Sequence, residues 1–203
     1  MTEIRRPSAP RLAPEERRRQ LLDVAKEEFA ERGFHATSMD DLALAAGVTK
    51  PVFYQHFASK RALFIAVLED VGGRLLAVLT HATAGATTGR ERVQEGFSAY
   101  FRFVVSDRAA FRLLFGASAR NDAEFADVVD QVLEDAAAAV SMLIEIDGTP
   151  EHRLALAHAL VGMAEGLSRH GLTDPDASHD PDQLAWWVAE MAWFGLRGVR
   201  SND

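Results

Sequence analysis

The sequence contains no cysteine in its 203 residues. This absence excludes disulfide bonds, thiolate metal sites and a cysteine nucleophile, and nothing in the chain calls for an oxidising compartment. No uninterrupted apolar run approaches the roughly 18 residues that a membrane-spanning helix needs. The segment 1–19 is rich in arginine and proline and lacks the apolar core of a secretory signal. We therefore expect a cytoplasmic protein that does not associate with a membrane.

Motifs of catalysis and phosphate binding are also missing. The sequence has no glycine-rich phosphate loop and no Gly-x-Ser-x-Gly motif. Its C-terminal histidines do not form a metal-binding pair at helical spacing beside a carboxylate motif. We therefore expect no enzymatic activity, no metal and no other cofactor. Two alternatives stay open: a helical enzyme with Glu165 and His170 as acid and base, and an adaptor that binds a partner protein through its last helix.

The charge is distributed unevenly along a chain of ordinary globular composition. Hydrophobic residues make up 48% and charged residues 26%, so a hydrophobic core can form. The formal net charge is −8, but residues 1–61 carry +2 and residues 62–203 carry −10. A polyanion would be repelled by the acidic C-terminal part. The N-terminal part is therefore the candidate for contact with nucleic acid.

Apolar residues recur at helical spacing along nearly the whole chain, and no segment alternates as a strand does. Serine, threonine or aspartate followed by a first-turn proline or a downstream acid marks several helix starts. The pattern predicts nine helices, with approximate bounds 14–32, 39–46, 50–58, 59–80, 93–104, 108–115, 125–144, 150–171 and 181–199. The predicted class is all-α, with a three-helix N-terminal head and a six-helix C-terminal body.

Residues 37–60 have the pattern of a helix-turn-helix motif. Gly47 suits a tight turn between two short helices, and Ala43 allows those helices to approach closely. A purely structural helical hairpin has the same spacing. What favours DNA binding is the outward face of the second helix, which carries donors for phosphates and base edges. These donors are Thr49, Lys50, Tyr54, Gln55, His56 and Lys60.

The same region resembles the N-terminal DNA-binding domain of the tetracycline-repressor (TetR) family. The resemblance rests on residues 37–43, 46–50, 52–57, 59–60 and 62–64, and it covers residues 15–67. It implies a homodimeric transcriptional regulator, usually a repressor, that binds a palindromic operator in double-stranded DNA. It also implies a helical C-terminal domain that binds a small-molecule effector and thereby weakens operator binding.

The resemblance assigns roles within the motif. Lys50, Pro51, Val52 and Tyr54 correspond to positions that contact bases and adjoining backbone, and Gln55, His56 and Lys60 to positions that contact the DNA backbone. Thr37 and Ser38 lie at the N-terminus of the preceding helix, where free N–H groups favour a phosphate. Pro51 departs from the glycine common in the family, and its ring cannot donate a hydrogen bond.

Three parts are expected along the chain: a disordered Arg/Pro-rich arm at 1–13, the helix-turn-helix DNA-binding domain at 14–58, and a regulatory domain for ligand binding and dimerisation at 59–203. The arm either enters an A·T-rich minor groove or is a solvated tail without function. The helix 59–80 joins the two domains. Its internal pair Gly72-Gly73 costs about 1 kcal/mol per glycine relative to alanine, so we expect a bend there that responds to ligand.

The aromatic stripes of the body, with a few polar residues, are candidates for a ligand pocket. The same stripes are also what a helical core looks like, so both interpretations stay open. The candidate ligand-binding residues are Phe97, Tyr100, Phe101, Phe111, Phe115, Met142, His158, Met163 and Glu165.

The last helix has more apolar surface than one face needs. One stripe, with Trp187 and Met191, is expected to pack on the chain's own body. A second apolar stripe would be left in water in a monomer, and the preceding helix has small residues that admit a partner helix. We expect a four-helix dimer interface formed by Ala155, Ala159, Gly162, Gly166, Trp186, Ala189, Trp193 and Phe194.

Overall fold

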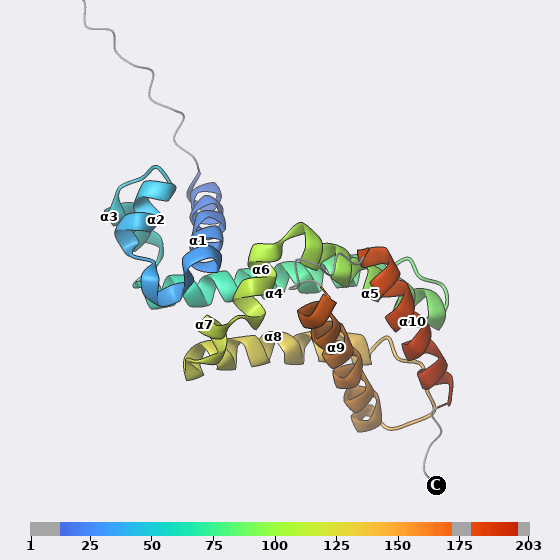
Figure 1. Ribbon diagram of the computed structural model, residues 1–203. Helices are drawn as coiled ribbons and strands as arrows, with labels where there is room; N and C mark the ends of the chain where they lie inside the picture. Colours follow the sequence, from blue (N-terminus) through green and yellow to red (C-terminus); the bar gives the residue numbers. More distant parts are fainter. Residues whose placement is uncertain (1–12, 172–179, 199–203) are drawn as a thin grey trace, which may run out of the picture. The chain divides into compact units, whose positions relative to one another are not determined.

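The computed structural model describes residues 13–171 and 180–198, apart from the side chains of residues 117, 118, 170 and 171. Within these ranges the chain forms ten helices and no strand, which confirms the all-α class (Figure 1). The predicted Arg/Pro-rich arm and the predicted end of the last helix lie outside the described residues. The chain divides into two compact units, residues 1–67 and 68–203, and the boundary falls inside the fourth helix.

The helices follow the predicted order with one addition. They are α1 (Pro14–Ala36), α2 (Met39–Ala45), α3 (Lys50–His56), α4 (Lys60–Thr83), α5 (Gly89–Ser106), α6 (Arg108–Phe115), α7 (Ala117–Arg120), α8 (Ala123–Ser141), α9 (Pro150–Gly171) and α10 (Pro181–Gly198). The sequence pattern did not predict α7, which has only four residues. The predicted stop of the first helix at Gly33 is confirmed: Gly33 has a φ of 79° and interrupts the helical geometry, and a short further turn continues to Ala36 within the bounds of α1.

Local capping explains most helix starts. The Ser38 hydroxyl accepts a hydrogen bond from the Asp41 N–H at 3.1 Å, and the Asp41 carboxylate accepts one from the Ser38 N–H at 2.9 Å. This reciprocal pair confirms the capping box predicted for α2. At α3, Thr49 has the extended backbone of a capping residue, but its hydroxyl makes no capping hydrogen bond.

The N-terminal unit has an aromatic core built by α1, α2, α3 and the start of α4. Phe29 and Phe64 meet edge to face with their ring centres 5.0 Å apart, a favourable arrangement for aromatic pairs. Phe53 and Phe57 are buried beside Leu42, so one face of α3 is fixed against the core. The opposite face of α3 is therefore left to solvent.

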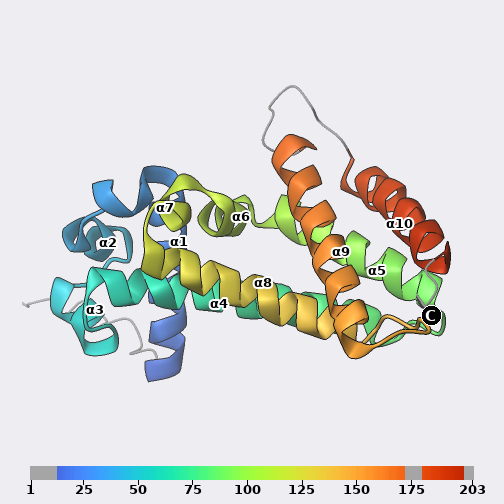
Figure 2. The same ribbon diagram turned by 90° about the horizontal axis from the view of Figure 1, so that it is seen from below.

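In the C-terminal unit, α10 lies along α5 and α9 crosses α8 (Figure 2). Small side chains on α10 allow the close approach to α5: Ala185, Ala189 and Ala192 are all buried. Ion pairs tie the two helices together, with Arg102 Nε 2.8 Å from the Asp182 carboxylate and Arg90 bound to Glu190. The inner face of α10 is thus its alanine-rich face.

Gly72 is a packing position rather than the predicted bend. α4 runs without interruption from Lys60 to Thr83. A Cβ atom at Gly72 would lie 2.4 Å from Cγ2 of Val132 on α8, whereas a Cβ at Gly73 would meet nothing within 4 Å. The glycine at 72 therefore lets the side chain of Val132 rest against the backbone of α4.

The two glycines predict opposite effects of the same substitution. Gly72→Ala should lower the free energy of unfolding by about 1–2 kcal/mol, because overpacking costs about 1–3 kcal/mol and the gain in helix propensity is only about 1 kcal/mol. Gly73→Ala should raise it by up to about 1 kcal/mol. Urea unfolding of both variants measures the difference. Adding Val132→Ala to Gly72→Ala should recover part of the loss, and two equally stable single variants would contradict the packing role.

Candidate nucleic-acid interface, ligand cavity and apolar face

The turn between α2 and α3 has the geometry of a helix-turn-helix. Gly47 has a φ of +64°, a left-handed conformation that glycine adopts without strain. The N–H of Gly47 donates to the carbonyl of Leu44 at 3.1 Å, and the N–H of Val48 donates to that of Ala43 at 3.0 Å. These bonds satisfy carbonyls at the end of α2 and direct the chain into α3.

The outward face of α3 presents most of the predicted DNA-contacting side chains. Thr49, Pro51, Tyr54 and Gln55 are exposed, with Tyr54 at 47%. The other members of the set on this segment, Lys50, Val52 and His56, are half-buried. This face brings polar donors, a proline ring and an aromatic ring to one surface, as contact with phosphates and base edges requires.

Lys50, at the start of α3, already has an acidic partner. Its Nζ lies 3.0 Å from the carboxylate of Asp40 on α2. The hydrogen bond and the charge of Asp40 raise the pKa of Lys50 above its usual value, so this side chain stays positive at neutral pH. Asp40 uses one of the three N–H donors of the Lys50 ammonium, so the others can still donate to a phosphate or a base acceptor.

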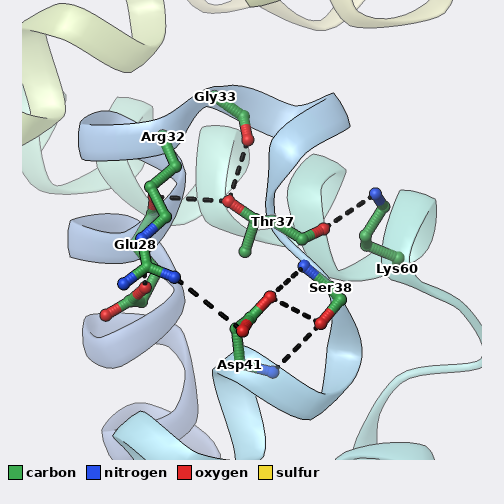
Figure 3. A network of polar contacts seen from close by, with 7 residues as sticks. All are labelled: Glu28, Arg32, Gly33, Thr37, Ser38, Asp41 and Lys60. Atoms are coloured by element: carbon green, nitrogen blue, oxygen red, sulfur yellow. Dashed lines mark hydrogen bonds and ion pairs between the residues drawn. The ribbon is translucent and has the colours of Figure 1, made fainter.

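Thr37 serves the interior of the N-terminal unit. Its side chain is 1% exposed, and its hydroxyl donates to the carbonyl of Gly33 at 2.8 Å (Figure 3). This hydroxyl is thus used at the end of α1, while the phosphate contact through N–H groups at the start of α2 stays a prediction. Ser38 is exposed, but its hydroxyl is 2.5 Å from the carboxylate of Asp41 within the capping box.

Lys60 also acts within the fold. Its Nζ donates to the carbonyls of Phe34 at 2.8 Å and Thr37 at 2.9 Å, and it lies 4.4 Å from the centre of the Phe34 ring. Figure 3 shows this side chain reaching from the start of α4 toward the segment that follows α1. The structure therefore gives Lys60 a clamping role at the end of α1, which uses two of its three N–H donors, and its contact with a DNA phosphate stays a prediction.

The C-terminal unit contains a cavity of about 330 Å³, within the size range of ligand sites. Side chains from α4, α5, α6, α8 and α9 line it, and most of them are aliphatic or aromatic. Four of the predicted ligand-binding residues lie on its wall: Phe97, Tyr100, Phe115 and Glu165.

The other predicted ligand residues lie elsewhere. Phe101 and Phe111 are buried in the core, and Met163 packs against that core. Met142 is 84% exposed in the segment after α8. His158 is exposed, with its Nε2 3.4 Å from the carboxylate of Glu134. The structure thus corrects these five assignments.

Polar groups on the cavity wall are few. Burial raises the pKa of Tyr100 to about 12, so its hydroxyl stays protonated and able to donate. Glu165 binds Arg169 and lies 3.4 Å from Arg120, an arrangement unlike that of a free catalytic acid. Arg92 is a charged wall residue that sequence reasoning missed, as it missed most of the aliphatic wall. Its signal was available, because it lies on the same face of α5 as Gly96 and Phe97, next to an apolar stripe.

The described residues give no support to metal binding: no group of three or more potential ligands is close enough together among them. The side chain of His170, proposed as a base in the alternative enzyme, lies outside the described residues. No helix in the described part of the chain has the length and apolar character to cross a membrane.

α10 and α9 present an apolar face to solvent. On α10 the exposed side chains are Trp186, Trp187, Met191 and Phe194, at 45–63% exposure. On α9 the predicted small residues are also exposed: Ala155, Ala159, Gly162 and Gly166. We call these eight residues the α9–α10 face.

Four positions on α10 differ from expectation. Ala189 is 5% exposed and packs within the chain. Trp193 packs over Gly89, where a Cβ would lie 3.1 Å from its Cζ3 atom. Trp187 and Met191, expected to face the body, are exposed instead. The helix is thus rotated relative to the predicted arrangement because its alanine face, and not its larger side chains, packs on α5.

Comparisons with known proteins agree for both units. Residues 21–67 match the family of bacterial regulatory proteins of the tetR family, and residues 90–195 match the tetracyclin repressor-like C-terminal domain. The HTH-type transcriptional activator FasR of Mycolicibacterium smegmatis is 37% identical over 191 residues, covering 93% of this chain and 87% of the relative.

Solved structures show the same fold. A TetR-like transcriptional regulator from Rhodococcus sp. RHA1 is 29% identical with a TM-score of 0.73, over 93% of this chain and 100% of that chain. The regulator FadR from Bacillus subtilis, solved in complex with stearoyl-CoA, is 16% identical with a TM-score of 0.71, over 90% of this chain and 99% of that chain. The chain therefore belongs to the TetR family of DNA-binding transcriptional regulators, which are not enzymes.

Proposed function

We propose that this chain is a ligand-responsive regulator that binds a palindromic operator as a homodimer and leaves it when a small molecule with a long apolar chain fills the C-terminal cavity. The observation that carries the proposal is the cavity of about 330 Å³ with largely apolar walls. One of those walls is α4, the helix that begins at Lys60 in the N-terminal unit.

The chemistry of the cavity favours an acyl ligand. Its walls consist mainly of aliphatic side chains such as Leu75, Leu79, Val132 and Leu133. Burial of an apolar chain among them is favourable by about 25 cal/mol per Å² of apolar surface removed from water. A protein of the same fold was solved with stearoyl-CoA, which has a long acyl chain. We therefore infer that the effector is a fatty acid or one of its thioesters.

A ligand can change DNA binding only if it prefers one of two arrangements of the protein. α4 is the element through which this preference acts, because it is both a cavity wall and continuous with the DNA-binding unit. At Gly72, α4 is packed closely against Val132 of α8. A shift of α8 around a ligand would therefore displace α4.

Repression stays our prediction for the sign of regulation, because the resemblance to the TetR family implies a repressor in most cases. FasR, the relative at 37% identity, is named an activator. A promoter fusion measured with and without the regulator decides between the two signs.

Filling the cavity tests the ligand response directly. Ala136 on α8 is buried and lines the cavity, whereas Ala138 on the same helix is exposed. Ala136→Phe should occupy the space of the ligand and abolish release from DNA by hexadecanoyl-CoA. Ala138→Phe should respond like the unsubstituted protein. Fluorescence polarisation of labelled operator, titrated with hexadecanoyl-CoA, gives both curves; full release of Ala136→Phe would contradict the cavity as the effector site.

The recognition helix predicts two classes of DNA-binding variant. Lys50→Ala and Tyr54→Ala should change sequence preference, at about 1–3 kcal/mol for a base contact. Gln55→Ala and His56→Ala should weaken binding to all DNA sequences alike and lower the salt dependence of the affinity. In vitro selection followed by binding titrations at several salt concentrations measures both effects, with exposed Arg112→Ala on α6 as the control. Selected sites without two-fold symmetry would contradict a dimer that reads half-sites about one helical turn, or ~34–36 Å, apart.

The α9–α10 face predicts the oligomeric state. A symmetric interface buries each side chain twice, so a charge at Trp187 or Phe194 is introduced on both sides of the axis. Trp187→Glu and Phe194→Glu should yield folded monomers with lost operator binding. Met142→Glu, at a still more exposed apolar residue that is not part of that face, should remain dimeric. Light scattering at micromolar concentration measures the mass of each variant. If Trp187→Glu and Phe194→Glu remain dimeric, the dimer interface does not lie on the α9–α10 face.

A further inference from the structure

One charged side chain on the cavity wall has unused hydrogen-bonding capacity. Arg92 on α5 lines the cavity, and its side chain is 18% exposed. One Nη atom binds the carboxylate of Glu145, while Nε is buried and has no acceptor among the described residues. A buried N–H without an acceptor is unfavourable. This edge of the guanidinium therefore favours a second oxygen.

The partner of Arg92 is easily replaced. Glu145 is 72% exposed and lies in the segment between α8 and α9. An exposed carboxylate regains its hydration when it leaves an arginine, so such pairs contribute little stability. A ligand anion with two oxygens can bind Nε and Nη together, which a single contact to Glu145 does not do.

Arg92 marks one end of the cavity. Thr83, near the end of α4, lies beside Gly96 of α5, with its methyl group 3.7 Å from where a Cβ would be. Tyr100 follows Arg92 by eight residues, or ~12 Å along the helix, and its hydroxyl is near Ser168. The walls between these two ends are mainly apolar.

The other charged wall residue does not compete for an anion. Glu165 is negative and already binds Arg169 and Arg120. It lies on α9 less than one turn before Ser168, and therefore toward the Tyr100 end. The cavity has a cation with a free donor at one end and a neutralised acid toward the other.

We propose that Arg92 binds the anionic group of an acyl ligand through Nε and Nη, displacing Glu145, while the apolar chain extends along the cavity toward Tyr100. This inference rests on the acyl ligand of the proposed function. The shared chemistry is a carboxylate or phosphate attached to an apolar chain. Glu145 acts as an internal competitor that lowers the affinity for such anions.

Binding of three probes to the full-length protein tests the inference: hexadecanoate, hexadecanol and hexadecanoyl-CoA, by calorimetry below their micelle concentrations. Arg92→Gln should lower the affinity for hexadecanoate or for hexadecanoyl-CoA by about tenfold. It should change the affinity for hexadecanol by less than about twofold. Glu145→Gln should raise the affinity for the same anion by about threefold. Arg90→Gln is the matched control, because Arg90 lies on the same helix, binds Glu190 at the surface and does not line the cavity.

The outcomes separate the inference from the proposal on which it rests. If Arg92→Gln loses affinity only for hexadecanoate, the group that Arg92 binds is a carboxylate. If it loses affinity only for hexadecanoyl-CoA, Arg92 binds the phosphates. Equal effects on hexadecanol and the anions overturn the role of Arg92 but keep the acyl cavity. Failure of the unsubstituted protein to bind any of the three probes overturns the acyl cavity itself. If Arg92→Gln does not fold, Arg92→Lys replaces it, and unchanged anion affinity in that variant overturns the two-oxygen contact.

Discussion

The contact between α4 and α8 at Gly72 fixes how closely these two helices of the C-terminal unit approach. With no side chain at this position, Val132 packs directly against the α4 backbone. Farther along, the same pair joins α5, α6 and α9 in surrounding the cavity. Since α4 starts at Lys60, whose ammonium holds the carbonyls of Phe34 and Thr37, one helix is anchored by backbone contacts in both units.

Features that depend on a few neighbouring residues could be predicted from the sequence. The Ser38–Asp41 capping box and the left-handed turn at Gly47 involve residues within one turn of each other, and both are present. The outward face of α3 follows from the burial of Phe53 and Phe57, which helical spacing also gives. Helix order and the all-α class were predictable for the same reason.

Features that depend on packing between distant segments could not be predicted. α10 has apolar residues all around it, so spacing alone does not tell which stripe turns inward; the answer lies in Ala185 and Ala189, which fit closely against α5. A cavity is a gap between helices, so an aromatic stripe does not predict it: Phe97 borders the gap while Phe101, one turn later, fills the core. Likewise, no local pattern shows that the ammonium of Lys60 is used at the end of α1.

The carboxylate of Asp40 beside Lys50 bears on how the protein searches a genome. A lysine whose charge is partly compensated by a neighbouring acid gains less from a phosphate, and the chain as a whole carries a net charge of −8. Both effects lower affinity for unrelated DNA, which offers millions of competing sites. Because the protein then dissociates from those sites sooner, a larger fraction of its molecules is free to bind the operator. We therefore expect Asp40, beside the start of α3, to shorten the time that the protein spends on DNA sites other than its operator.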